Sequence, residues 1–85
     1  MGKQLLQPRA GVEVVVKKRR VRRTKRIREQ RGLSAHKAAV AIGTTAPTII
    51  RHDNGDRTMR YPTLQAYARL LGLSIEEALA FEEDY

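Results

Sequence analysis

Lysine and arginine residues crowd into one stretch of the chain, KKRRVRRTKR at positions 17–26. Residues 1–31 hold 12 of the 17 basic side chains against two acidic ones, whereas residues 76–85 hold five acidic side chains and no basic one. Closely spaced cations bind polyanions, because each phosphate that they neutralise releases condensed counterions. The stretch therefore predicts binding to a nucleic acid; the alternative is a solvated, disordered tail.

The two histidines, His36 and His52, belong to no recognisable catalytic or metal-binding pattern. They lie 16 positions apart in a chain without cysteine, and no metal-ligand spacing surrounds them. The sequence also shows no Ser/His/Asp arrangement, no paired carboxylates and no glycine-rich phosphate loop. We therefore expect no enzymatic activity, no metal and no cofactor, and we expect His52 to contact phosphate or to lie partly covered at the surface.

Length and composition limit the class of protein. With 85 residues the chain has room for one domain with a compact, helix-rich core. The absence of cysteine excludes a disulfide framework. Apolar runs are a few residues long, far below the roughly 20 residues of a membrane span, and the first residues lack the apolar segment of a secretory signal. These features predict a cytoplasmic protein with no membrane partner, associated with the nucleoid if it binds DNA.

A short strand is the first element that the sequence predicts. Residues 12–17, VEVVVK, are β-branched and partly alternate in polarity. Because a single strand needs a partner, we expect the segment from Val12 to Lys17 to pair with its copy in a second subunit. The competing interpretation is an arm that becomes ordered only on DNA. We accordingly divide the chain into a basic arm, residues 1–19, and a helical domain, residues 20–85.

Five helices are predicted in the domain. The first runs from about Arg20 to just before Gly32, on three- and four-residue spacing of its apolar side chains. Serine or threonine before the first turn and glycine after the last bound most of the others. Their expected ranges are residues 35–42, 46–53, 61–71 and 75–82. Pro47 falls in a first turn, where the N–H that it lacks would be unbonded anyway. The acidic end of the last helix is expected to be solvated or, alternatively, to shield the basic arm.

Two helices joined by a short turn, with others packed around them, form the helix-turn-helix layout, and here the sequence resembles a known family. The stretch IREQRGLSAHKAAVAIGTTAPTIIRHDNGDRTMRYPTLQAYARLLGLSIEEAL is similar to the DNA-binding domain of phage repressor and Cro-type (XRE-type) regulators. The positions that match in register are Arg28, Ser34, Ala39, Gly43, Thr48, Ile49, Arg51, Asp53, Asn54 and Gly55. The resemblance covers roughly residues 24–80 and implies an all-α, compact five-helix domain, with a buried Ile49 and a third helix that enters the major groove.

The chain departs from the family pattern at several positions. Ala46 and Pro47 stand at the head of the third helix and Ala35 opens the second, where the family has polar residues that touch DNA. Fewer hydrogen-bonding side chains remain there to distinguish bases. Thr24 and Ala38 replace large apolar residues, so we expect a thinner core or one filled by the N-terminal segment.

The resemblance implies a set of DNA-contacting residues. Arg51 is long enough to reach a guanine edge, Thr48 offers a hydroxyl and a methyl group, and Ile50 or Pro47 can meet a thymine methyl group. Threonines and a lysine at the helix ends are expected to hold phosphates. The expected set on the domain is Lys37, Thr44, Thr45, Ala46, Pro47, Thr48, Ile50, Arg51, Asn54 and Arg57. The set at the basic end, expected to grip phosphates or the minor groove, is Lys17, Lys18, Arg19, Arg20, Arg22 and Arg23.

The predicted function is sequence-specific binding of double-stranded DNA by a transcriptional regulator. We expect a repressor that acts as a homodimer on a two-fold operator and blocks the promoter. An antitoxin that binds a toxin and regulates its own operon is one alternative, and an RNA-binding or protein-interaction adaptor that uses the basic arm is another. The family also has an arginine and an acidic residue at positions 28 and 53, so we expect Arg28 and Asp53 to form an ion pair.

Overall fold

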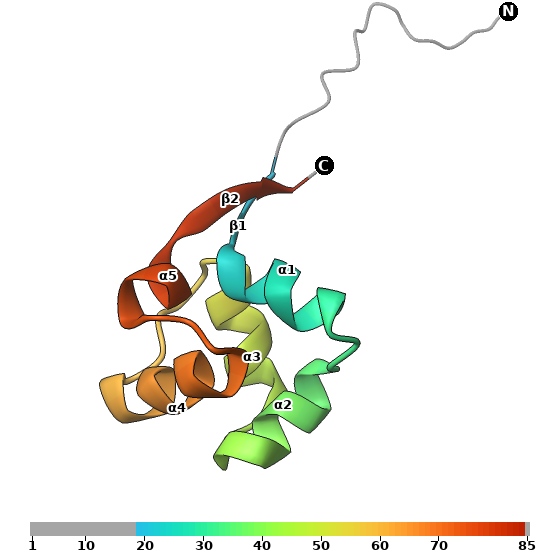
Figure 1. Cartoon of the computed structure of the whole chain (residues 1–85), viewed down its shortest axis with the longest axis vertical. Coiled ribbons are helices and arrows are strands. Elements are labelled where there is room, and N and C mark those ends of the chain that lie inside the picture. Colours follow the sequence, from blue (N-terminus) through green and yellow to red (C-terminus); the bar gives the residue numbers. More distant parts are fainter. Residues whose placement is uncertain (1–18, 85) are drawn as a thin grey trace, which may run out of the picture.

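The computed structural model describes residues 19–84, which fold as five helices between two short strands (Figure 1). The elements are β1 Arg19–Arg22, α1 Arg23–Gln30, α2 Ala35–Ile42, α3 Ala46–Asp53, α4 Tyr61–Leu71, α5 Ile75–Leu79 and β2 Phe81–Asp84. The helical, five-helix fold expected from the sequence is confirmed. The strand expected at residues 12–17 lies outside the described residues.

Local signals set the angle between α2 and α3. The Ser34 side chain accepts a hydrogen bond from the Lys37 amide at 3.1 Å and begins α2. Gly43 ends it with φ of 75°, a left-handed conformation that glycine adopts without strain. Thr45 then precedes α3, with Pro47 in the first turn. The predicted boundaries of α2, α3 and α4 are therefore confirmed, and two short helices meet across a tight turn.

The two ends of the domain differ from the prediction. Helix α1 begins at Arg23 rather than near Arg20, and α5 ends at Leu79 rather than near Glu82. The residues outside them pair as an antiparallel two-stranded sheet, in which Arg19 faces Asp84, Arg20 faces Glu83, Val21 faces Glu82 and Arg22 faces Phe81. The prediction of helix at both ends was wrong because this pairing joins a basic strand to an acidic strand from the far end of the domain, which local periodicity does not reveal.

The core lies where α2, α3 and α4 meet. Tyr67, Ile49 and Leu71 are its largest fully buried apolar side chains, and the small Ala38 and Ala39 let α2 approach closely. The expected burial of Ile49 is confirmed. Within residues 19–84, no helix combines the length and apolar character that crossing a membrane requires.

A buried polar cluster surrounds Asp53 at the end of α3. Asp53, 1% exposed, accepts hydrogen bonds from Thr24 at 2.7 Å, from the Tyr67 hydroxyl at 2.9 Å and from Arg28 Nε at 3.0 Å. The expected ion pair between Arg28 and Asp53 is confirmed. Thr24, one of the two positions where we expected a thinner core or one filled by the N-terminal segment, is fully buried and hydrogen-bonded to this carboxylate.

The cluster also shifts the ionisation of its members. Burial, reinforced by the negative charge of Asp53, raises the pKa of the Tyr67 hydroxyl, so it stays a hydrogen-bond donor. Burial acts to lower the pKa of Arg28, but the adjacent carboxylate more than offsets this effect and the pKa is raised. Arg28 also donates to the Leu33 carbonyl at 2.9 Å. Burying these charges is tolerable because each is paired and hydrogen-bonded.

Candidate nucleic-acid interface

Helix α3 has one buried and one exposed face. Ile49, His52 and Asp53 are buried, whereas Pro47, Ile50 and Arg51 face solvent. Ile50 is 45% exposed. The exposed face thus offers a guanidinium group beside apolar surface, which is the combination that contacts base edges and thymine methyl groups in a major groove.

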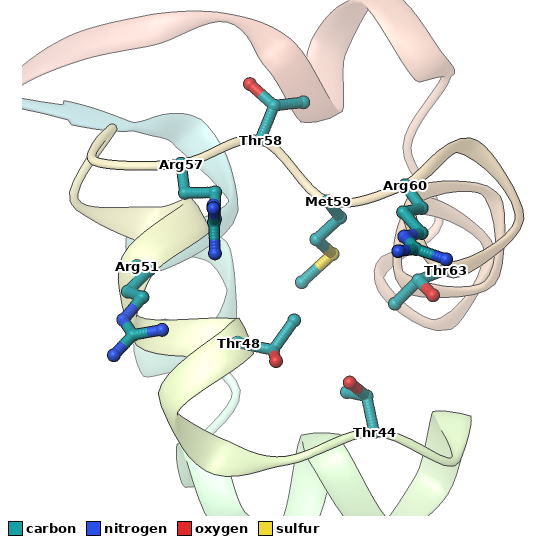
Figure 2. Close-up of a pocket in the computed structure, with 8 residues that line it drawn as sticks. All are labelled: Thr44, Thr48, Arg51, Arg57, Thr58, Met59, Arg60 and Thr63. Carbon is teal, nitrogen blue, oxygen red and sulfur yellow. The ribbon is translucent and has the colours of Figure 1, made fainter.

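A hollow of about 440 Å³ lies beside this helix, between the start of α3, the loop of residues 56–60 and the start of α4 (Figure 2). It is lined by Thr44, Thr48, Arg51, Arg57, Thr58, Met59, Arg60 and Thr63. Three arginines, four threonines and one buried methionine thus surround it, and no acidic residue does. Within residues 19–84, the three guanidinium groups have no ion-pair or hydrogen-bond partner. The hollow therefore offers unpaired positive charge and hydroxyl groups to an anion.

Backbone hydrogen bonds hold the loop against the end of α3. The amides of Asp56 and Arg57 both donate to the Arg51 carbonyl, at 2.9 and 3.3 Å. Gly55 makes the turn possible with φ of 80°. These bonds keep Arg57 close to Arg51, so the loop and the helix present their guanidinium groups from neighbouring positions (Figure 2).

A protein-family model described as a helix-turn-helix domain matches residues 21–81 of the chain. The chain belongs to this helix-turn-helix family. The prediction made from the resemblance is therefore confirmed at the level of the family, and α2 and α3 are the two helices of the DNA-binding motif. No curated protein matches the chain.

The helix-turn-helix domain brings together several of the residues predicted to contact DNA. Thr44, Thr48, Arg51 and Arg57 line the hollow. Pro47 and Ile50 lie on the exposed face of α3, Ala46 and Asn54 are half-buried at its two ends, and Lys37 is exposed in the first turn of α2. Thr45 precedes α3 as expected, but its hydroxyl pairs with that of Thr48 at 2.9 Å instead of capping a backbone amide.

Sequence reasoning missed four residues of the hollow, Thr58, Met59, Arg60 and Thr63. Thr58, Met59 and Arg60 belong to the loop and Thr63 to the first turn of α4, and they reach the hollow because the loop returns the chain to the side of α3. The sequence signal was present in part, since Pro62 marks a helix start directly after Arg60. The path of the loop, however, depends on the burial of Met59 in the core.

The residues predicted at the basic end differ in their surroundings. Lys17 and Lys18 lie outside the described residues, and for Arg19 the structure describes only its place in β1. Arg20 is exposed, with its guanidinium carbon 5.1 Å from the centre of the Phe81 ring. That distance is typical of a cation–π contact. Arg20 therefore remains at the surface, where an anion can reach it.

Arg22 lies in the interior of the domain, not on a DNA-facing surface. It is 6% exposed; Nη1 donates to the Leu79 carbonyl at 2.6 Å and Nη2 to the Thr58 hydroxyl at 3.0 Å. Burial lowers the pKa of this guanidinium, while the charge of Asp53 acts in the opposite direction. A direct phosphate contact by Arg22 does not fit this position, because its guanidinium nitrogens are enclosed and two of them are already bonded.

The acidic end of the domain binds two arginines. Glu82 pairs with Arg23 Nε at 2.7 Å and with Arg26 Nη2 at 2.9 Å. These bonds, with that from Arg26 the largest contribution, lower the pKa of Glu82 to about 2, so the carboxylate is charged at neutral pH. The expectation of a solvated helix end was wrong, because this segment is a paired strand. The pairing of Arg23 supports the alternative in which the acidic segment covers basic side chains.

His52 is part of the core and not a phosphate contact. It is fully buried; its Nε2 lies 3.0 Å from the Ala78 carbonyl, and the Met59 amide donates to its Nδ1 at 3.5 Å. Burial is the main cause of a lowered pKa, and the ring is therefore neutral with its proton on Nε2. The expectation of a surface histidine was wrong, because β1, α5 and the loop cover this side of α3. Among the described residues, no group of three or more potential ligands could hold a metal ion.

Proposed function

We propose that this helix-turn-helix protein regulates transcription by sequence-specific binding of double-stranded DNA, as a repressor that occupies a promoter. The observation that carries the proposal is the hollow beside α3, where Arg51, Arg57 and Arg60 gather and which no carboxylate of residues 19–84 lines. Unpaired arginines next to a helix of the DNA-binding motif supply the charge that neutralises phosphates and the donors that recognise bases.

The parts of the surface take different roles in this proposal. Arg51 enters the major groove from α3 and donates to the O6 and N7 of a guanine, while Ile50 and Pro47 meet thymine methyl groups. Arg57 and Arg60 lie at the margin of the hollow and contact the phosphates that flank the groove. The threonine hydroxyls add neutral hydrogen bonds, which orient the backbone without a large change in net charge.

We further propose that the protein binds as a homodimer on a two-fold site. One small helix-turn-helix module buries little surface on DNA, and two modules on one face of the duplex multiply affinity and specificity. The half-sites are then expected about one helical turn apart, or about 10 base pairs from centre to centre.

Selection of bound sites from a random duplex library tests the proposal. The expected result is an inverted repeat with this spacing, and a guanine in each half-site whose enrichment is lost in Arg51→Ala. Arg69→Ala is a matched control, because Arg69 is an exposed arginine of α4 that does not line the hollow. Equal binding to random duplexes, or tighter binding to single-stranded RNA, would overturn sequence-specific recognition and favour an adaptor.

A further inference from the structure

We propose that Arg22 is a positioning residue for DNA binding, which acts from the interior by fixing the loop of residues 56–60 so that Arg57 faces the DNA. The inference rests on the proposed function, because it assumes that Arg57 contacts a phosphate. It assigns to Arg22 a role that does not involve touching DNA.

The contacts of Arg22 join three segments that are far apart in the sequence. The residue itself belongs to β1, its Nη1 binds the carbonyl of Leu79 at the end of α5, and its Nη2 binds Thr58 in the loop. Its guanidinium carbon also lies 4.4 Å from the centre of the Phe81 ring in β2. One planar side chain therefore sets the position of the loop relative to the terminal sheet.

Fixing Thr58 also fixes the direction of its neighbour. The hydroxyl of Thr58 points away from Met59 and toward the C-terminal segment, whereas the side chain of Arg57 points toward α3 (Figure 2). The amide of Arg57 is held by the Arg51 carbonyl, so the bond from Arg22 to Thr58 fixes the other end of this pair of residues. Without that bond, we expect the direction of the Arg57 side chain to vary.

The sheet to which Arg22 belongs is itself docked on the end of α3. The ring of Phe81 packs against Gly55, where a Cβ atom would stand 2.6 Å from a ring carbon. A side chain at position 55 would therefore displace Phe81 as well as strain the backbone, whose φ is 80°. Because Phe81 fixes the sheet against the end of α3, the position of Arg22 relative to the loop is fixed as well.

Burying the guanidinium of Arg22 costs free energy that its contacts do not fully offset. This cost argues that Arg22 has a role in binding as well as in stability. No carboxylate is hydrogen-bonded to its guanidinium, and its buried Nε has no partner among the described residues. A buried charge that lacks a bonded counter-ion is commonly less stabilising than an apolar side chain of the same size. The geometry that Arg22 imposes on the loop, and not the energy of its burial, then accounts for an arginine at this position.

A double-mutant cycle tests the inference with a duplex that the wild type binds specifically. Arg22→Met keeps the packing on Phe81 but removes both hydrogen bonds, and we expect affinity to fall by about 3- to 10-fold. In an Arg57→Ala background the same change should have no further effect. Thr58→Val should match Arg22→Met, whereas Thr58→Ser keeps the hydroxyl and should bind as the wild type does. All dissociation constants are compared at a temperature where thermal melts show each variant to be folded.

The alternatives give different results. If Arg22 contacts phosphate directly, Arg22→Met weakens binding equally in both backgrounds and Thr58→Val has no effect. If Arg22 only stabilises the fold, Arg22→Met lowers the melting temperature, but both variants bind DNA as the wild type does. Either result overturns the inference and leaves the proposed function intact. If the wild type binds no duplex, both the inference and the proposed function are overturned. If Arg22→Met does not fold, Thr58→Val tests the inference instead, because Thr58 is exposed.

Discussion

The arginines of this domain fall into two groups that differ in their partners, and the comparison shows how one residue type serves two purposes. Arg22, Arg23 and Arg28 are bound by carbonyl, hydroxyl or carboxylate groups and hold the fold together. Arg51 in α3 and Arg57 in the loop after it have no side-chain partner within the described residues. Charge density in the sequence is higher around the first group, yet the second group is the one that the fold leaves open to an anion.

The largest effect on stability is expected from removing Asp53, the carboxylate that binds Arg28 in the interior. Asp53→Ala removes the acceptor of three buried donors and leaves the charge of Arg28 without its partner. Removing one member of a buried pair costs about 3–5 kcal/mol. Thermal or urea denaturation measures the loss, and Asp56→Ala, on an exposed aspartate, is the control. A loss as small as that of the control would mean that the cluster does not stabilise the domain.

Removing an arginine without a side-chain partner should affect DNA binding and leave stability nearly unchanged. Arg51→Ala is expected to leave the free energy of unfolding within about 0.5 kcal/mol of the wild type, because the side chain is exposed and unpaired. It should nevertheless remove about 1–3 kcal/mol of discrimination at one base pair in each half-site. Binding titrations against the selected site and its single-base variants measure this. Uniform weakening on all duplexes would instead make Arg51 a phosphate contact.

His52 sharpens the comparison, because it lies on the covered side of α3 and must stay neutral there. Its folded pKa is lowered below the ordinary 6.5 by burial, so the unfolded chain binds the proton more tightly. Its contribution to stability is present above about pH 6.5 and is lost as the pH falls through the folded pKa, at up to about 1.4 kcal/mol per pH unit. Melting temperatures from pH 7.5 to 4.5 should show this decline in the wild type and in His36→Gln. The decline should be weaker in His52→Gln, and an equal decline in that variant would assign it to other groups.

The smallest effect on stability is expected at the ion pairs between Glu82 of β2 and two arginines of α1. Glu82→Gln frees Arg26 and leaves Arg23 with only its longer pair to Glu77, at 3.8 Å. The melting temperature should change only slightly, because such pairs are screened by solvent. Affinity for random duplexes should rise, and the slope of log K against log salt should steepen by up to about one for each arginine that gains a phosphate. Since the pKa of Glu82 is about 2, the wild type should not show this change between pH 5 and 8. Unchanged binding to DNA would show that these arginines do not face it.

The parts of the fold that sequence analysis predicted correctly depend on local chemistry. Ser34 and Gly43 bound α2 within one segment of chain, and Gly72 ends α4 in the same way. The terminal sheet could not be predicted so, because Val21 fits the apolar spacing of a helix as well as a strand. Its partner strand lies beyond five helices, and no short-range pattern connects the two.

In the candidate site, too, the residues that sequence analysis named are those whose position depends on one local element. Arg51 and Thr48 follow from their place on one helix, whereas Arg60 joins them only through the path of a loop. Arg22 and His52 were placed at the surface because their residue types are usually exposed or charged. Burial is decided by what packs against a residue, and here the covering elements are the two strands and α5.

The pairing of β1 with β2 has a mechanical consequence. Because the strands are antiparallel and lie at the two ends of the domain, Arg19 and Asp84 form the outermost pair and Arg22 and Phe81 the innermost (Figure 1). Tension applied to the chain on both sides of the domain therefore loads the pairs one at a time, in the manner of a zipper, instead of shearing them together. The sheet should open at low force as far as Arg22, where the bonds to Leu79 and Thr58 resist further peeling and shield the helices from the pull.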